Sequence, residues 1–149
     1  GSVLGLPELS DRIASLEIPT TAYTSGVMLS AAYHIGVSAD DIYSSPSALV
    51  GSIGSIMTIS ETENAPKIHV FTSEGADLKG TFAGQLTESQ ASFLQAQVDK
   101  SGADFRMYVE DRRYSVNSEV FRAGWYSGDE ALELGLVDDQ SPQLSNLIN

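Results

Sequence analysis

The sequence predicts an α/β domain whose strands pair mostly in parallel. Segments rich in β-branched residues alternate along the chain with segments of helical periodicity, which is typical of that class. Hydrophobic residues make up 42% of the 149 positions and charged residues 19%, a balance typical of globular chains. We therefore expect a single domain over residues 1–149, with its core at about 3–139 and a tail at 140–149.

The first half of the chain contains two predicted helices and four extended segments. The first helix, residues 8–16, presents Leu9, Ile13 and Leu16 at helical spacing. The second helix is predicted at residues 30–36. Extended segments, recognised by β-branched residues between Gly, Pro and Asn boundaries, are predicted at 20–25, 42–44, 52–59 and 67–72.

Two capping boxes predict the helices of the second half. Thr87 and Gln90 have the spacing of such a box, and the helix that follows is expected to reach about Arg112. Ser127 and Glu130 form a second box before a short helix that ends near residue 135. The residues from 140 onward are predicted to be a tail or a segment that awaits a partner.

Composition excludes several classes of function. The formal net charge of −12 argues against a nucleic-acid partner, because binding phosphates requires clustered Lys and Arg. The absence of cysteine excludes disulfides, zinc–thiolate sites and cysteine nucleophiles. Two histidines, and aspartate pairs at 40–41 and 138–139 without calcium-loop spacing, lead us to expect no metal and no cofactor. No signal peptide opens the chain and no apolar run reaches the ~20 residues of a membrane span, so we expect no membrane segment.

Ser30 is the candidate nucleophile of this sequence. It follows an apolar segment and stands at the start of a predicted helix, where the helix dipole favours negative charge. The amide of Ala31 would lie beside it and could donate a hydrogen bond to an oxyanion. A serine at such a position is also a common helix N-cap, and Ser25 is a competing serine.

A serine hydroxyl becomes a nucleophile only with a base within hydrogen-bond reach. Lys79, in a glycine-flanked loop, could be that base if burial beside Leu78 and Phe82 kept its amine neutral. Most lysines are solvated, so the pattern alone leaves this role open. His34, four residues after Ser30, is the alternative base, although no acid is placed to orient its ring.

Three motifs along the chain point to a family. Residues 30–35 read Ser-Ala-Ala-Tyr-His-Ile, followed by Ala-Asp-Asp-Ile at 39–42, Pro46 and Gly-Ser-Ile-Gly-Ser at 51–55. Residues 73–80 read Ser-Glu-Gly-Ala-Asp-Leu-Lys-Gly, and residues 123–138 read Ala-Gly-Trp-Tyr-Ser-Gly-Asp-Glu-Ala-Leu-Glu-Leu-Gly-Leu-Val-Asp. Together they resemble the signal peptide peptidase A family of serine peptidases, whose members include phage prohead (capsid maturation) proteases. The family's Ser-Gly-Gly is Ser-Ala-Ala here, and its lysine loop is shorter.

The resemblance implies a fold and a chemistry. The fold would be the ClpP/crotonase-like β-α superhelix without its N-terminal strands and their glycine-rich turn, so residues 1–149 would be a single catalytic-domain fragment. Ser30 and Lys79 would form a catalytic Ser–Lys dyad, and the missing turn would supply the second oxyanion donor. A protein or peptide substrate would bind extended beside residues 53–58, contacting Ile53, Gly54, Ser55 and Ile56. The fold also implies a homo-oligomer.

The assignment we favour of four is a phage prohead protease that cleaves scaffold or capsid proteins, located in the host cytoplasm or prohead interior if the chain is viral. The first alternative is the soluble part of a bacterial signal peptide peptidase. The other two are a crotonase-like acyl-CoA enzyme and a non-catalytic assembly module of the same fold.

Overall fold

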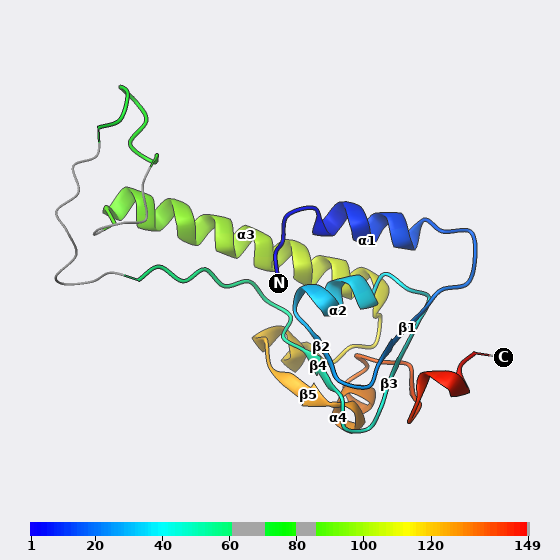
Figure 1. The fold of residues 1–149 in the computed structure, drawn as a ribbon. Helices are drawn as coiled ribbons and strands as arrows, with labels where there is room; N and C mark the ends of the chain where they lie inside the picture. Colours follow the sequence, from blue (N-terminus) through cyan, green and yellow to red (C-terminus); the bar gives the residue numbers. More distant parts are fainter. Residues whose placement is uncertain (61–70, 80–85, 149) are drawn as a thin grey trace. The chain divides into compact units, whose positions relative to one another are not determined.

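The structure is a computed structural model that describes residues 1–60, 71–79 and 86–148. The chain divides into two compact units (Figure 1). The first comprises residues 1–54 and 102–149, and the second comprises residues 55–101.

Two small sheets form the first unit. β1 (Thr21–Thr24), β3 (Asp41–Ser44) and β6 (Asp139–Gln140) make a parallel sheet in the order β1-β3-β6. The second sheet has the order β2-β4-β5, in which β2 pairs with β4 in parallel and β4 with β5 antiparallel. Its strands are β2 (Val27–Leu29), β4 (Leu49–Gly51) and β5 (Trp125–Ser127). The predicted α/β class with mostly parallel pairing is therefore confirmed.

The predicted helices are present with small shifts at their ends. They are α1 (Leu6–Ala14), α2 (Ala31–Gly36), α3 (Glu88–Arg112) and α4 (Gly128–Glu133), with short 3-10 helices η1 (Ser118–Arg122) and η2 (Leu144–Asn146). Both capping boxes form. The Thr87 N–H donates to Gln90 Oε1 and the Gln90 N–H to Thr87 Oγ1, each at 3.2 Å. Ser127 and Glu130 exchange the equivalent bonds before α4.

One predicted strand is wrong. Residues 52–59 lie in no strand, and the strand at this point is β4, which ends at Gly51. The reason is backbone geometry, because Gly51 and Ser52 have φ values of 121° and 55° and turn the chain out of the ladder. Most of the strand predicted at 67–72 lies outside the described residues, and Phe71 and Thr72 are in no strand.

The predicted apolar face of the first helix is also wrong in part. Leu9 and Leu16 are exposed, and α1 buries Leu6 and Ser10 instead. The helix begins after Gly5, which has φ 72°, and the face of α1 that packs on α2 carries Ser10 in place of an apolar residue. Ser10 is accommodated there because it has a hydrogen-bond partner on α2.

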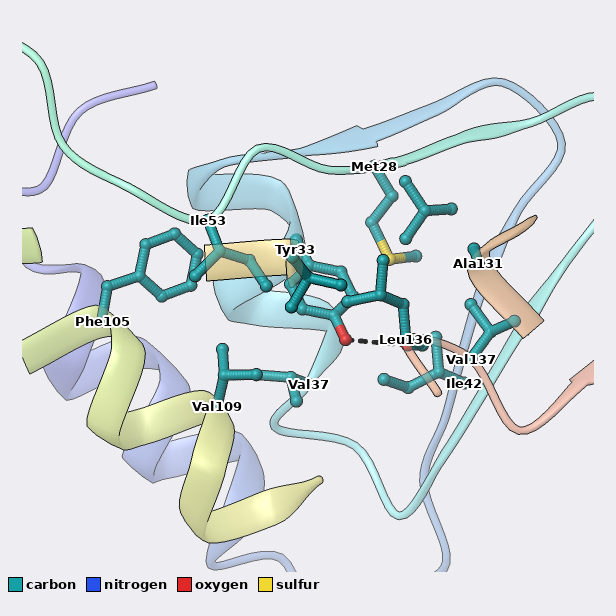
Figure 2. Packing of buried hydrophobic residues seen from close by; sticks show 12 residues of the cluster. Met28, Tyr33, Val37, Ile42, Ile53, Phe105, Val109, Ala131, Leu136 and Val137 are labelled. Atoms are coloured by element: carbon teal, nitrogen blue, oxygen red, sulfur yellow. Dashed lines mark hydrogen bonds between the residues drawn. The ribbon is translucent and has the colours of Figure 1, made fainter. Parts of the chain in front are cut away.

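The hydrophobic core lies in the first unit (Figure 2). Its buried members come from both sheets, from α2, the last part of α3, η1 and α4, and from the segments that connect them: Met28, Tyr33, Val37, Ile42, Val50, Ile53, Phe105, Val109, Val120, Ala131, Leu136 and Val137. Tyr33 is fully buried, and its hydroxyl donates to the carbonyl oxygen of Leu136 at 2.8 Å. This bond satisfies a polar group that would otherwise be costly in the core.

The second unit differs in its burial. None of its described residues is buried, and Ile56 and Phe71 are about nine-tenths exposed, at 89% and 93%. Its two ends meet where the hydroxyls of Ser55 and Ser101 share a hydrogen bond of 2.8 Å. The described part of this unit therefore has no apolar core of its own.

Candidate functional site

Ser30 joins β2 to α2 in an unusual backbone conformation. Its φ and ψ are 56° and −124°, a region that residues with a side chain rarely occupy. Its N–H donates to the carbonyl oxygen of Gly51 at 2.9 Å, and its carbonyl accepts from the His34 N–H at 3.0 Å. Such a conformation costs about 1–3 kcal/mol and persists only where neighbouring structure holds it.

The Ser30 side chain does not serve the role that serines usually have at this position. Ser30 is the N-cap residue of α2, but its hydroxyl makes no capping hydrogen bond to any described residue of that helix. The residue is half-buried. Its hydroxyl is therefore available for another interaction, which favours the nucleophile over the simple cap.

Ser52 occupies the equivalent place on the neighbouring strand. Leu29 and Gly51 are register partners in β2 and β4, so Ser30 and Ser52 follow adjacent strand ends. Ser52 also has a positive φ, and its N–H donates to the carbonyl oxygen of Gly124 at 2.7 Å. Ligands of parallel sheets commonly bind at this carboxyl edge. Sequence reasoning gave Ser52 no role, and the signal that could have singled it out is the serine directly after the strand-ending Gly51.

Ala31, the expected oxyanion donor, is the first residue of α2. N–H groups in the first turn of a helix have no carbonyl partner within the helix, so that of Ala31 is free to donate outward. Gly1 lies against this residue, because a Cβ added to Gly1 would stand 2.8 Å from the Ala31 Cβ. The backbone of Gly1 therefore lies beside the first turn of α2.

His34 is not arranged as a base for Ser30. Its Nδ1 lies 2.8 Å from the Ser10 hydroxyl, and its ring stacks on Tyr108 with centroids 4.1 Å apart. Burial is the main cause that lowers the pKa of His34 below its ordinary value. The residue is a packed histidine that joins three helices.

The remaining predicted site residues are divided between the two units. Ile53 is buried in the core and Gly54 follows it, both in the first unit. Ser55, Ile56 and Lys79 belong to the second unit. Lys79 is exposed in a turn in which its N–H donates to the Ala76 carbonyl at 3.0 Å, and Leu78 beside it is 43% exposed. Phe82, the other expected apolar neighbour, lies outside the described residues.

Two further properties concern the described residues as a whole. The described residues contain no group of three or more His, Asp or Glu side chains that could hold a metal ion. None of the helices described is both long enough and apolar enough to cross a membrane.

Comparison with known proteins identifies relatives. The family model for Peptidase family S49 matches residues 12–144. "Putative protease MJ0651" from Methanocaldococcus jannaschii is 29% identical over 93% of this chain and 48% of its own length. "Probable protease SohB" from Haemophilus influenzae is 28% identical over 87% of this chain and 38% of its own length. The chain thus spans less than half of each of these relatives.

Solved structures show the same fold. The serine-to-alanine mutant of a protein named 1510-N membrane-bound stomatin-specific protease has a TM-score of 0.60 and 14% identity, over 99% of this chain and 62% of its own. A lysine-to-alanine mutant of that protease, in complex with a substrate peptide, has a TM-score of 0.57 and 15% identity, over 99% and 58%. The mixed α/β, ClpP-like fold expected from the sequence is therefore confirmed.

Proposed function

Because the chain belongs to peptidase family S49, we propose that it forms part of a serine endopeptidase with Ser30 as nucleophile and Lys79 as general base. The observation that carries this proposal is the backbone of Ser30. Strained backbone positions cluster at active sites, and the hydroxyl of this serine at the end of β2 is not used to cap α2, so it is available to attack a substrate.

The reaction follows the usual course of acyl transfer. The Ser30 Oγ attacks the peptide carbonyl carbon while its proton passes to the neutral amine of Lys79. The Ala31 N–H donates to the oxyanion of the tetrahedral intermediate. The lysine then gives its proton to the leaving amine, which departs and leaves an ester on Ser30. Water, activated by the same amine, hydrolyses that ester and restores both groups.

Lys79 needs an additional surface to act in this way. A lysine amine becomes neutral near physiological pH when it is removed from water, yet Lys79 is exposed in its unit. We infer that bound substrate or another protein surface covers it during the reaction. The two solved relatives support this pair of residue types, because one is a serine mutant and the other a lysine mutant bound to a substrate peptide.

The proposed substrate is an extended peptide beside residues 53–58. This segment lies in no strand of the described sheets, which makes its backbone a candidate for pairing with an added strand. Ile53 would contribute only its backbone, because its side chain is 2% exposed in the core. Gly54 and Ser55 would continue the pairing, and Ile56 would offer an exposed side chain to the substrate.

The relatives favour the assignment to a signal peptide peptidase over the other three. They come from an archaeon and a bacterium and are named as proteases, so we propose a SohB-like or signal peptide peptidase-like enzyme. The prohead protease and its location in a phage-infected cell stay predictions, as does the homo-oligomer. The genes that neighbour the coding sequence would test the prohead protease, and the mass of the protein in solution would test the homo-oligomer.

Labelling with a fluorophosphonate, followed by mass spectrometry of the modified peptide, tests the nucleophile in the intact protein. We expect the label on Ser30 and its loss in Ser30→Ala, with turnover of a peptide substrate at least ~1000-fold lower. Ser25→Ala, in the exposed loop before β2, is the matched control, and this variant should still be labelled on Ser30. A label on Ser25 or Ser52 in the wild type would contradict the assignment.

Lys79→Ala tests the base, with Lys100→Ala as the control lysine. We expect Lys79→Ala to fold normally, bind peptide and lose turnover about as completely as Ser30→Ala. Full turnover in Lys79→Ala would overturn its role. Turnover of an acyl-CoA instead of peptides would favour the crotonase-like enzyme, and partner binding unaffected by either variant, without turnover, would favour the assembly module.

A further inference from the structure

His34 joins α2 to two other helices. On one side, its Nδ1 shares a hydrogen bond of 2.8 Å with the hydroxyl of Ser10, a fully buried residue of α1. On the other side, its ring contacts Phe105 and stacks on Tyr108, both from α3. We call Ser10, His34, Phe105 and Tyr108 the His34 cluster. It is a mixed polar and aromatic contact between α1, α2 and the end of α3.

The cluster is poorly suited to a positive charge. The guanidinium of Arg112 lies 3.6 Å from the Tyr108 ring centroid, so that ring is held between Arg112 and the imidazole. Asp11 on α1 is the facing acid, and its carboxylate is 4.0 Å from Arg112. The Tyr108 hydroxyl is paired with that of Ser38 at 2.9 Å. An imidazolium would thus be buried against Phe105 and Tyr108, with Arg112 against the same Tyr108 ring and the facing acid, Asp11, already paired with Arg112.

The bond to Ser10 does not itself prevent protonation. Its hydroxyl also lies 3.4 Å from the carbonyl oxygen of His34 and can turn its proton there when Nδ1 becomes a donor. Burial is the largest influence and lowers the pKa of His34. A backbone hydrogen bond raises the pKa, Arg112 lowers it and Asp11 raises it, and the net result is a lowered pKa. The free-energy cost of protonating His34 is therefore reduced when the imidazole is exposed to water.

α1 is the element that can move to provide that exposure. It buries only Leu6 and Ser10, whereas the end of α3 places Phe105 and Val109 in the hydrophobic core. A nine-residue helix is not stable by itself in water, so the docking of α1 depends on these few contacts. Elements with few buried contacts are the first to open.

We propose that protonation of His34 releases α1 from α2, so that the His34 cluster makes the docking of α1 sensitive to mildly acidic pH. Because His34 donates its N–H to the carbonyl of Ser30, release of α1 would also loosen the first turn of α2. The first statement goes beyond the proposed peptidase and does not depend on it. The effect on Ser30 rests on the proposed function.

The sign of the pH effect follows from linkage. In the docked state the pKa of His34 is lowered, and in the released state the exposed imidazole has its ordinary pKa of about 6.5. The released state therefore binds more protons. Docking is therefore fully favoured above that pH and weakens as the pH falls. The equilibrium constant for release should rise by up to about tenfold per pH unit below about 6.5.

Amide hydrogen exchange of α1 tests the release. In the intact wild-type protein, exchange of residues 6–14, corrected for intrinsic rates, should speed up as the pH falls from about 7.5 to about 5.5. His34→Phe keeps an aromatic ring to stack on Tyr108 but cannot titrate, so this pH response should disappear. His69→Gln removes the other histidine and should keep the response. A response that survives in His34→Phe, or is lost in His69→Gln, would overturn the proposal.

A second measurement covers the case in which His34→Phe fails to fold. The ring protons of His34 in the wild type, titrated by NMR, should change with the same midpoint as the α1 amides. Different midpoints, or α1 amides that do not respond, would overturn the proposal.

Fluorophosphonate labelling of Ser30 then tests the coupling. The labelling rate should fall more steeply with acid in the wild type than in His34→Phe, and equal profiles would exclude coupling. If Ser30 is never labelled, the proposed function fails, while hydrogen exchange still decides whether α1 is released.

Discussion

At the scale of single residues, the backbone of Ser30 is the feature with the clearest consequence. Its hydroxyl chemistry could be suspected from the sequence, but its left-handed φ could not, because a serine at a helix start normally has extended dihedral angles. The conformation is held from both sides, by the Gly51 carbonyl and by the His34 amide. The strain and the free hydroxyl together distinguish this serine from an ordinary N-cap.

Substitutions at Ser30 can measure that strain. Ser30→Gly should be more stable to urea than Ser30→Ala by about 1–2 kcal/mol, because glycine adopts a positive φ without a Cβ penalty. At Ser25, which has no positive φ, the order should reverse or the difference vanish. Equal unfolding free energies for the two Ser30 variants would show that this backbone is unstrained.

At the scale of secondary-structure elements, the start of α4 shows how packing adds to a local signal. The capping box of Ser127 and Glu130 is local in sequence, and for that reason it was predicted correctly. Gly128 within the box has a second role that depends on β3. Its Cα faces the backbone of Ser45 and the hydroxyl of Ser44, with no room for a side chain.

Gly128→Ala should therefore destabilise the protein although alanine is the better helix former. The added Cβ would overlap the Ser45 carbonyl oxygen and stand 2.9 Å from Ser44 Oγ, so α4 would have to move off β3. We expect a loss of about 3 kcal/mol in the free energy of unfolding, measured with urea. Gly26→Ala is the control, because a Cβ there meets nothing within 4 Å among the described residues. A Gly128 variant as stable as the Gly26 variant would refute this packing.

At the scale of the whole molecule, Arg113 connects parts of the first unit that are distant in sequence. Its Nε donates to the Gly135 carbonyl at 3.0 Å, and its Nη1 lies 2.7 and 2.8 Å from the two carboxylate oxygens of Asp138. Asp138 in turn accepts the N–H of Ile42 at 2.8 Å. The end of α3, the turn after α4 and strand β3 are thus held by one polar network.

Arg113→Lys tests that network while keeping the charge. An ammonium cannot reproduce the planar set of donors, so we expect a loss of about 1–3 kcal/mol in urea-induced unfolding. Arg106, in an exposed pair with Glu110, also lies 4.6 Å from the Phe121 ring centroid, and Arg106→Lys should change stability by less than about 1 kcal/mol. Similar losses in the two variants would mean that the Arg113 contacts add no more than a surface pair.

What could be predicted from the sequence is what depends on neighbouring residues. Hydrophobic periodicity and the two capping boxes were enough for the helices and for the α/β class, because these signals act over a few positions. The three motifs at residues 30–55, 73–80 and 123–138 were together enough for the family. The side chains of Ser30 and Lys79 could be nominated in the same way, as residue types with the required chemistry.

Tertiary contacts decided the rest. The end of β4 depends on Gly51 and Ser52, whose turn is held by the carbonyl of Gly124, far along the chain. The buried face of α1 depends on the hydrogen bond between Ser10 and His34. The strained backbone of Ser30 depends on the carbonyl of Gly51, which belongs to the neighbouring strand. Such partners are brought together only by the folded chain, because hydrogen bonds between segments remote in sequence leave no periodic or local signal in either one.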